Sequence, residues 1–353
     1  MSEQLPGPVL VIGCGLIGTS IALALTETGA AVHLADIRAA NLELAVSRGA
    51  GSADPVEAPA LVVVAVPPAD VAPTVARALV DWPEAVVTDV ASVKGALQRA
   101  IAGGPGSDRY VGSHPMAGSE RSGPMAASAR LFEGRPWAVT AAPEAAPDAI
   151  DLVVRLATMV GGVPLVMDAA AHDRAVALVS HVPHVLSVLT AARLNDAPDD
   201  HLALAGPGLR DVTRIAGSEI ALWQDILGAN ADEVRAVLER VRTDLDRVIS
   251  AIGDDAGGLG EVLQSGRDGT QLIPGKHGEK VAEFATVFVS VADQPGELPR
   301  VMAHTGESGV NIEDIRIDHE LGRPVGQVEI TVLAAQADTL VKALIARGWS
   351  AYS

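Results

Sequence analysis

A glycine-rich turn between a predicted strand and a predicted helix constrains the fold of this chain more than any other stretch. Residues 13–18 read Gly-Cys-Gly-Leu-Ile-Gly, after the apolar run 8–12 and before an Ala- and Leu-rich segment that ends near Thr28. In such a turn the first glycine permits a tight bend, the second lets the backbone approach a pyrophosphate, and the third lets the helix pack on the strand. The helix N-terminus offers free N–H groups to phosphate, so the predicted cofactor contacts are Gly13, Gly15, Leu16, Ile17 and Gly18.

A carboxylate at the end of the second predicted strand selects between two cofactors. Asp36 directly follows the strand 31–35. An acid at this place accepts hydrogen bonds from the ribose 2′-hydroxyl of NAD and repels the 2′-phosphate of NADP. Arg38 lies two residues further on and keeps NADP open as an alternative. We therefore expect NAD as the cofactor.

Strands and helices continue to alternate after this site. Further strands are predicted at 61–66, 85–89, 110–112, 137–140 and 163–167, with helices between them. This alternation is typical of a parallel, doubly wound sheet, whose ligands bind beyond the carboxyl ends of the strands. Val66 and Pro67 end one of these strands and are expected to lie over the cofactor.

The stretch 112–120 (Gly-Ser-His-Pro-Met-Ala-Gly-Ser-Glu) places His114 on a predicted loop at the same edge. A histidine there can reach a substrate that lies against a nicotinamide ring, and a neutral imidazole accepts a proton near pH 7. A structural hydrogen bond is the alternative role for His114. Ser92 either bonds to His114 or to substrate, or caps the helix that follows it. Lys94 is expected to be a solvated residue in the first turn of that helix.

From about Ala169 to Ser265 the apolar spacing becomes helical. Pro183 stands between His181 and His184 and removes a backbone hydrogen bond, so we expect a kink with a substrate pocket opening there. The two histidines have no cysteine or His-Glu-x-x-His motif beside them, so no metal site is expected.

A second polar group follows in the helical segment. Arg210 and Arg214 lie one helical turn apart, with Asp211 beside them. A guanidinium binds a carboxylate through two parallel hydrogen bonds, which suits Arg214 to an anionic substrate. A surface Arg–Asp pair is the alternative.

The last part of the chain is predicted to be a separate small module. Residues 266–280 are polar and glycine-rich and are expected to form a linker. The elements after it follow a βαββαβ order, which is a ferredoxin-like fold. We therefore expect three domains: a nucleotide-binding domain (1–168), a helical substrate-binding and dimerisation domain (169–275), and a regulatory domain (281–353).

Composition excludes several classes of function. The net charge of −18 disfavours nucleic acid and anionic membrane surfaces as partners. Cys14 is the single cysteine, which indicates a reducing compartment and, with no signal peptide at the start, a cytoplasmic protein. No uninterrupted apolar run approaches the roughly 18 residues of a membrane span.

Taken together, these motifs resemble those of the prephenate/arogenate dehydrogenase (TyrA) family with a C-terminal ACT domain. The resemblance covers nearly the whole chain and is carried by the glycine turn with Asp36 and by four further strings. These are Asp-Val-Ala-Ser-Val-Lys (89–94), Ser-His-Pro-Met-Ala-Gly (113–118), Ser-His-Val-Pro-His (180–184) and Arg-Asp-Val-Thr-Arg-Ile-Ala (210–216). Asp-Gln-Pro-Gly-Glu-Leu (293–298) is similar to the amino-acid-binding turn of ACT domains.

The resemblance implies NAD-dependent oxidative decarboxylation of prephenate to 4-hydroxyphenylpyruvate in tyrosine biosynthesis. It implies that His114 accepts the ring hydroxyl proton with Ser92 beside it, and that Arg214 binds a substrate carboxylate. It also implies a homodimer that is inhibited by tyrosine at the ACT domain. Arogenate dehydrogenase and a non-catalytic amino-acid sensor remain alternatives. Further pocket residues implied by the resemblance are His184, Glu120, Asp211 and Trp223.

Overall fold

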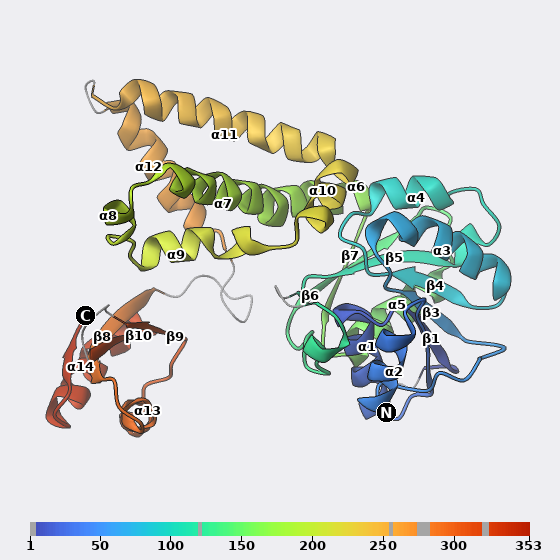
Figure 1. Ribbon diagram of the computed structural model, residues 1–353, viewed down its shortest axis with the longest axis horizontal. Helices are drawn as coiled ribbons and strands as arrows, with labels where there is room; N and C mark the ends of the chain where they lie inside the picture. Colours follow the sequence, from blue (N-terminus) through green and yellow to red (C-terminus); the bar gives the residue numbers. More distant parts are fainter. Residues whose placement is uncertain (1–4, 119–121, 254–256, 274–282, 320–324) are drawn as a thin grey trace. The chain divides into compact units, whose positions relative to one another are not determined.

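The computed structural model describes residues 5–118, 122–253, 257–273, 283–319 and 325–353 (Figure 1). The chain divides into two compact units, residues 1–242 and 243–353, and each is described by itself. The three domain boundaries expected from the sequence remain predictions.

A seven-stranded sheet forms the core of the first unit, in the order β2-β1-β3-β4-β5-β6-β7. Strands β1 to β5 are parallel, and the chain order reverses at β1, which has β2 on one side and β3 on the other. Ligands of such sheets bind in the crevice at this switch point. The strands are β1 (Val9–Ile12), β2 (Val32–Ala35), β3 (Leu61–Val64), β4 (Val86–Asp89), β5 (Tyr110–Pro115), β6 (Pro136–Ala141) and β7 (Val163–Met167).

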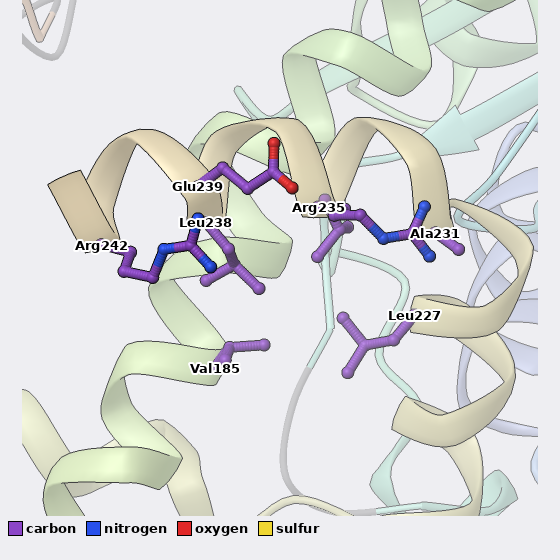
Figure 2. Close-up of a pocket in the computed structure, with 8 residues that line it drawn as sticks. Val185, Leu227, Ala231, Arg235, Leu238, Glu239 and Arg242 are labelled. Atoms are coloured by element: carbon purple, nitrogen blue, oxygen red, sulfur yellow. The ribbon is translucent and has the colours of Figure 1, made fainter.

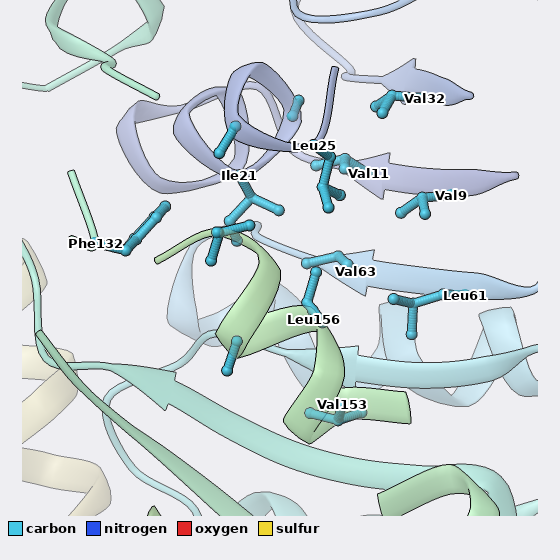
Figure 3. Close-up of a cluster of buried hydrophobic side chains, with 14 of the residues drawn as sticks. Val9, Val11, Ile21, Leu25, Val32, Leu61, Val63, Phe132, Val153 and Leu156 are labelled. Carbon is cyan, nitrogen blue, oxygen red and sulfur yellow. The ribbon is translucent and has the colours of Figure 1, made fainter. Parts of the chain in front are cut away.

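Helices cover both faces of the sheet at β1 and β3, and both strands are entirely apolar and almost fully buried. Successive side chains of a strand point to opposite faces, so Val9 and Val11 pack with α1, α2 and α5, whereas Leu10 packs with α3. Figure 3 shows the first of these clusters, with β1, α1 and α5 contributing side chains. The helices are α1 (Leu16–Glu27), α2 (Ala39–Ser47), α3 (Pro68–Asp81), α4 (Gly95–Ile101) and α5 (Pro147–Met159).

Strand β6 departs from the parallel arrangement expected from the sequence. It runs antiparallel to β5, with His114 opposite Ala138. A parallel pair needs a crossover connection, usually a helix. The described residues between β5 and β6 contain only the short 3₁₀ turn η2 (Pro124–Ala126), so the chain returns beside β5 in the opposite direction.

Helices make up the rest of the first unit. Helix α6 contacts α4 and β6 of the sheet region, and α7 contacts α9 and η5. The expected kink at Pro183 is a π-helical turn, η3, directly before α7. Pro183 cannot donate to the carbonyl of Val179, and the wider turn accommodates this missing bond. The elements are α6 (Ala169–Val176), η3 (Ala177–His181), α7 (Val182–Ala192), η4 (Arg193–Asp196), α8 (Asp199–Leu202), α9 (Pro207–Thr213), η5 (Arg214–Gly217), α10 (Ile220–Ala229) and α11 (Ala231–Ala251), which runs into the second unit.

The second unit contains a four-stranded antiparallel sheet in the order β11-β8-β10-β9. Its element order confirms the predicted ferredoxin-like βαββαβ fold. The expected linker from Gly266 is wrong as far as Thr270, because those residues lie in α12 (Gly257–Thr270). The other elements are β8 (Phe284–Ala292), α13 (Glu297–Glu307), β9 (Asp314–His319), β10 (Val325–Leu333), α14 (Ala334–Ala346) and β11 (Ser350–Tyr352).

Candidate active site

The glycine turn lies at the switch point of the sheet and contacts the loop that follows β3. Gly13 has a φ of 104°, and a Cβ added there would lie 2.4 Å from the carbonyl oxygen of Ala65. A Cβ on Gly18 would lie 2.0 Å from the carbonyl oxygen of Gly13. A Cβ on Gly15 would meet nothing within 4 Å, so this glycine borders open space. The turn is therefore closed on the protein side and open where a pyrophosphate would approach.

The remaining features of this crevice fit NAD. Gly15 precedes α1 without any side-chain cap, which leaves the first-turn N–H groups of Leu16 and Ile17 for phosphate. Asp36 accepts hydrogen bonds from the backbone N–H groups of Cys14, at 2.6 Å, and Arg38, at 2.7 Å, which holds its carboxylate beside the turn. Val66 and the exposed Pro67 follow β3 at the same edge. Burial, and then the charge of Asp36, raise the pKa of the Cys14 thiol to about 12, so it stays protonated.

His114 lies within β5, not on a loop as expected, because β6 continues the strand pairing as far as Pro115. β5 is parallel to β4, so His114 is at the carboxyl edge of the sheet. Its Nδ1 atom is 3.0 Å from Nε2 of His172 on α6, and the two rings meet edge to face with centroids 5.2 Å apart. A residue of the helical segment thus reaches directly into the sheet edge.

Asp173 joins the same two regions. Its Oδ1 atom is 2.8 Å from Nδ1 of His172 and accepts a hydrogen bond from the backbone N–H of Lys94 at 2.9 Å. Its Oδ2 atom accepts from the N–H of Gly95 at 2.8 Å. A carboxylate from α6 therefore caps the N-terminus of α4. The expectation that Ser92 caps this helix is wrong, since Lys94 is the N-cap and makes no side-chain cap bond.

Lys94 is buried, not solvated as expected. Its ammonium group donates to the Asp89 carboxylate and, at 2.7 Å, to the carbonyl of Ser113. The hydroxyl of Tyr110 donates to the other oxygen of Asp89 at 2.7 Å. The side chains of Lys94 and Asp89 are 0% exposed, and this cluster bonds to the backbone of Ser113, the residue before His114.

The surroundings keep the imidazole of His114 neutral. Burial has the largest effect, and the neighbouring His172, Lys94 and His181 act in the same direction. Together they hold the pKa of His114 well below its ordinary value of 6.5. A neutral imidazole at pH 7 has one ring nitrogen able to accept a proton.

His184 and Trp223 form an aromatic wall in the helical segment. Their rings are stacked with centroids 3.5 Å apart, and His181 meets the same indole edge to face. Burial lowers the pKa of His184, and burial together with His172 lowers that of His181 to about 4. Asn230 donates to the carbonyl of Asp173 at 2.8 Å and contacts Nδ1 of His181 at 3.2 Å. One buried polar network therefore connects His114 to this wall.

The structure does not bring the other predicted residues into this network. Arg214 is exposed on η5, and among the described residues it has no hydrogen bond or ion pair. Asp211 is exposed on α9, and Ser92 lies half-buried in the loop before α4. Glu120 lies outside the described residues. The roles of these four side chains remain predictions, as do those of His114, His184 and Trp223.

Three residues of the network were missed as site residues: His172, Asp173 and Asn230. The signal for the first two was the adjacent His-Asp pair near the start of a predicted apolar helix, where buried polar residues need partners. No local feature marks Asn230. Among the described residues no group of three His, Cys, Asp or Glu side chains could hold a metal, and the absence of a metal remains a prediction.

A groove in the helical segment lies apart from the His114 network. It runs between α7, α10 and α11, and Figure 2 shows Val185, Leu227 and Leu238 along it with Arg235 and Glu239 at its border. None of the network residues lines it. We therefore assign it no part in catalysis.

Comparison with known proteins identifies two consecutive parts of the chain. Residues 21–166 match the family model described as the nucleotide-binding domain of prephenate dehydrogenase. Residues 168–265 match the model described as the dimerization domain of prephenate dehydrogenase. The second match covers the segment that contributes His172, His184, Trp223 and Asn230.

Full-length relatives and solved structures agree. The chain is 37% identical over 358 residues to the probable prephenate dehydrogenase NovF of Streptomyces niveus, covering 98% of this chain and 99% of that protein. It is 28% identical to prephenate dehydrogenase of Bacillus subtilis over 89% of each chain. The crystal structure of Aquifex aeolicus prephenate dehydrogenase in complex with hydroxyphenyl propionate and NAD+ has a TM-score of 0.70 and 28% identity, covering 76% of this chain and 99% of that one.

These matches confirm the cofactor and the enzyme class expected from the sequence. Asp36 lies within the match to a nucleotide-binding domain, and the glycine turn directly precedes that match. The chain is an NAD-dependent oxidoreductase. The match to NovF, at 37% identity, covers 98% of this chain and therefore extends over both units. The chain belongs to the prephenate dehydrogenase family.

Proposed function

We propose that this enzyme oxidatively decarboxylates prephenate to 4-hydroxyphenylpyruvate, with His114 as the base. The observation that carries the proposal is a half-buried, neutral imidazole at the carboxyl edge of the sheet, with Nδ1 within hydrogen-bond distance of His172. Its Nε2 atom is left to accept the proton of the substrate's ring hydroxyl. NAD, when bound, supplies the hydride acceptor. Loss of the carboxylate as CO2 leaves the ring aromatic with its oxygen as a phenolate. The protein therefore has to orient the substrate, accept the hydroxyl proton and return it to that oxygen.

Recognition of the substrate's carboxylates falls to Arg214 in this proposal. Its guanidinium is exposed, and within the described chain it is not committed to any carboxylate. A fork of N–H donors binds a carboxylate through two parallel hydrogen bonds. Arg214 would also offset locally a net charge of −18, which otherwise repels an anionic substrate. The stacked His184 and Trp223 would form the wall of the pocket, and Ser92 a polar contact beside His114.

Formation of NADH, followed by its absorbance, tests the proposal. Purified protein with NAD should produce NADH when prephenate is added. Arogenate is tested in parallel, because an arogenate dehydrogenase of Synechocystis matches this chain with a TM-score of 0.63 at 26% identity. Turnover with arogenate alone would make this an arogenate dehydrogenase. Turnover with neither substrate would favour an amino-acid sensor.

We also propose that the working form is a homodimer built on the helical segment. The segment 168–265 matches a dimerization domain, and it exposes large apolar side chains that a second copy would cover. These include Leu178, Val179, Leu186, Val188 and Leu189. Residues 169–196 are long and apolar enough to cross a membrane by length and composition. The same residues bury His172, Asp173 and His181 against neighbouring elements, so we propose a domain helix in a cytoplasmic enzyme.

Catalysis is expected to persist in mildly acidic solution. Burial, His172, Lys94 and His181 keep the pKa of His114 well below 6.5. Since only the neutral imidazole accepts a proton, kcat/KM should fall as the pH drops through this lowered pKa, not through 6.5. The measurement is the pH profile of kcat/KM for prephenate, with folding checked at each pH by circular dichroism. An acid limb at or above 6.5, in folded protein, would contradict the proposed environment of His114.

The C-terminal sheet is proposed to be an ACT domain that binds tyrosine as an inhibitor. It has its own apolar core, which includes Val287, Val289, Ile330 and Leu340, so its removal should leave the first unit intact. A chain that stops before Phe284 is expected to keep its kcat and to lose inhibition by tyrosine. The measurement is the initial rate with and without tyrosine for both chains. A full-length enzyme that tyrosine does not inhibit would make this domain a structural or assembly module.

A further inference from the structure

His114 can accept a proton only through a ring nitrogen that carries none. We propose that His172 and Asp173 are positioning residues that fix His114 in the tautomer with its proton on Nδ1, leaving Nε2 bare toward the substrate. This inference rests on the proposed function, because it assigns the base its active form. It follows from the direction of two hydrogen bonds.

The first bond fixes the tautomer of His172. An ionised carboxylate only accepts hydrogen bonds. Burial raises the pKa of Asp173, but the hydrogen bonds from His172 and from the backbone N–H groups of Lys94 and Gly95 outweigh it, and the pKa is lowered overall. Asp173 Oδ1 is 2.8 Å from His172 Nδ1, so this nitrogen must carry the proton. In neutral His172, Nε2 is then an acceptor.

The second bond, between His172 and His114, fixes the tautomer of His114. His172 Nε2 is 3.0 Å from Nδ1 of His114, and two bare nitrogens do not attract one another. With His172 neutral, the proton between them belongs to Nδ1 of His114. Nε2 of His114 is left as the acceptor, which is the atom that the proposed reaction needs. A second proton on His172 would reverse this bond and place the proton of His114 on Nε2.

Backbone and side-chain contacts fix the positions of His172 and Asp173, which together with His114 are called the relay. Asp173 is anchored to the N-terminus of α4 by two backbone N–H groups, and Asn230 donates to its carbonyl. His172 is 1% exposed, and Asp173 is 7% exposed. A Cβ added to Gly95 would lie 2.8 Å from Oδ2 of Asp173, so a glycine at that place gives the carboxylate room to dock. The relay thus links the helical segment to the base in a single orientation.

Kinetics of two substitutions at one position test the relay. His172→Leu removes the acceptor for Nδ1 of His114, and kcat should fall about 10²-fold, within the roughly 10²–10⁴-fold that a general base supplies. KM for prephenate should change less than about threefold, because the relay acts on the reacting proton and not on substrate binding. His172→Gln retains an amide oxygen as acceptor and should recover at least about tenfold of the lost kcat. His33→Gln and His33→Leu are the matched controls. Among the described residues, the imidazole ring of His33 makes a hydrogen bond only with the carbonyl of Asp54.

Unchanged kcat in His172→Leu would overturn the relay. Equal losses of kcat in the Leu and Gln variants would also overturn it. A purely structural role of His172 predicts that result, together with equal losses of thermal stability in the two variants. The stability of each variant is measured by thermal unfolding alongside the kinetics.

The tautomer is also measured directly, without turnover. In wild-type protein labelled with ¹⁵N-histidine, long-range ¹H–¹⁵N spectra distinguish a protonated ring nitrogen from a bare one. The expected pattern is a proton on Nδ1 in both His114 and His172, with the two rings assigned from the spectra of His114→Asn and His172→Gln. A proton on Nε2 of His114 would overturn the inference. This readout is independent of the substrate, so failure of the NADH assay would overturn the proposed function without deciding the tautomer.

Discussion

Replacing His114 by asparagine is expected to lower kcat by about 10²–10⁴-fold, the range typical of a lost general base. Asparagine is polar and fits the space of the imidazole, and its amide N–H can donate to Nε2 of His172 as Nδ1 of His114 does. It has no nitrogen that accepts a proton near neutral pH. The loss should therefore fall on turnover, while the buried network stays closed.

NAD binding is the measurement that separates chemistry from structure in this variant. The glycine turn and Asp36 follow β1 and β2, whereas His114 is on β5, so the affinity for NAD should stay within about threefold of wild type, as expected for a lost proton-transfer role. Titration calorimetry with NAD and the NADH assay with prephenate give the two numbers. His33→Asn controls for loss of a histidine elsewhere in the sheet region. Lost NAD affinity in His114→Asn would assign His114 a structural role, and near-normal kcat would place the base on another residue.

The cofactor crevice was predictable from sequence because its determinants are local. The glycine turn, the helix after it and Asp36 all lie within residues 9–36, so the whole pattern can be recognised in one short stretch of sequence. The fold of the second unit was predictable for a similar reason, since its strands and helices alternate with clear spacing. The direction of β6 was not, because it depends on a connection that lacks a crossover helix.

The partners of the base could not be read from the sequence. His114 and His172 are 58 residues apart, and Asp173 reaches a backbone group 79 residues away. Local reasoning placed His114 on a loop and Lys94 in solvent. The strand extends past Gly112 because it pairs with β6. Lys94 is buried because the fold brings the carbonyl of Ser113 to its ammonium group, beside the nearby Asp89. The same reasoning left a capping role open for Ser92 beside a bond to His114 or substrate, and Asp173 performs the capping from another helix. Long-range polar contacts therefore decided the details of the site, whereas local patterns predicted most of the fold apart from the direction of β6.

The buried ammonium of Lys94 is expected to matter most for stability. Burial lowers the pKa of Lys94, while the charge of the adjacent Asp89 and its hydrogen bond act to raise it. The attraction between the two groups therefore offsets part of the cost of burying the ammonium. Asp89 accepts from Lys94, from the hydroxyl of Tyr110 at 2.7 Å and from the N–H of Ala91 at 2.8 Å. Removing the cation leaves a carboxylate buried without its counter-ion.

Lys94→Met is therefore expected to lower the free energy of unfolding by about 3–5 kcal/mol, the usual cost of breaking a buried ion pair from one side. Urea denaturation followed by circular dichroism measures it. Arg77→Met is the matched control, because the Arg77–Asp81 pair is exposed, at 82% and 42% for the two side chains, and should contribute only about 0–1 kcal/mol. The double variant Lys94→Met with Asp89→Leu removes both charges and should recover part of the loss, since no unpaired charge remains. A loss of under about 1 kcal/mol in Lys94→Met would mean that water or a protonated Asp89 compensates for the missing ammonium, and that the cluster behind His114 is not a closed ion pair.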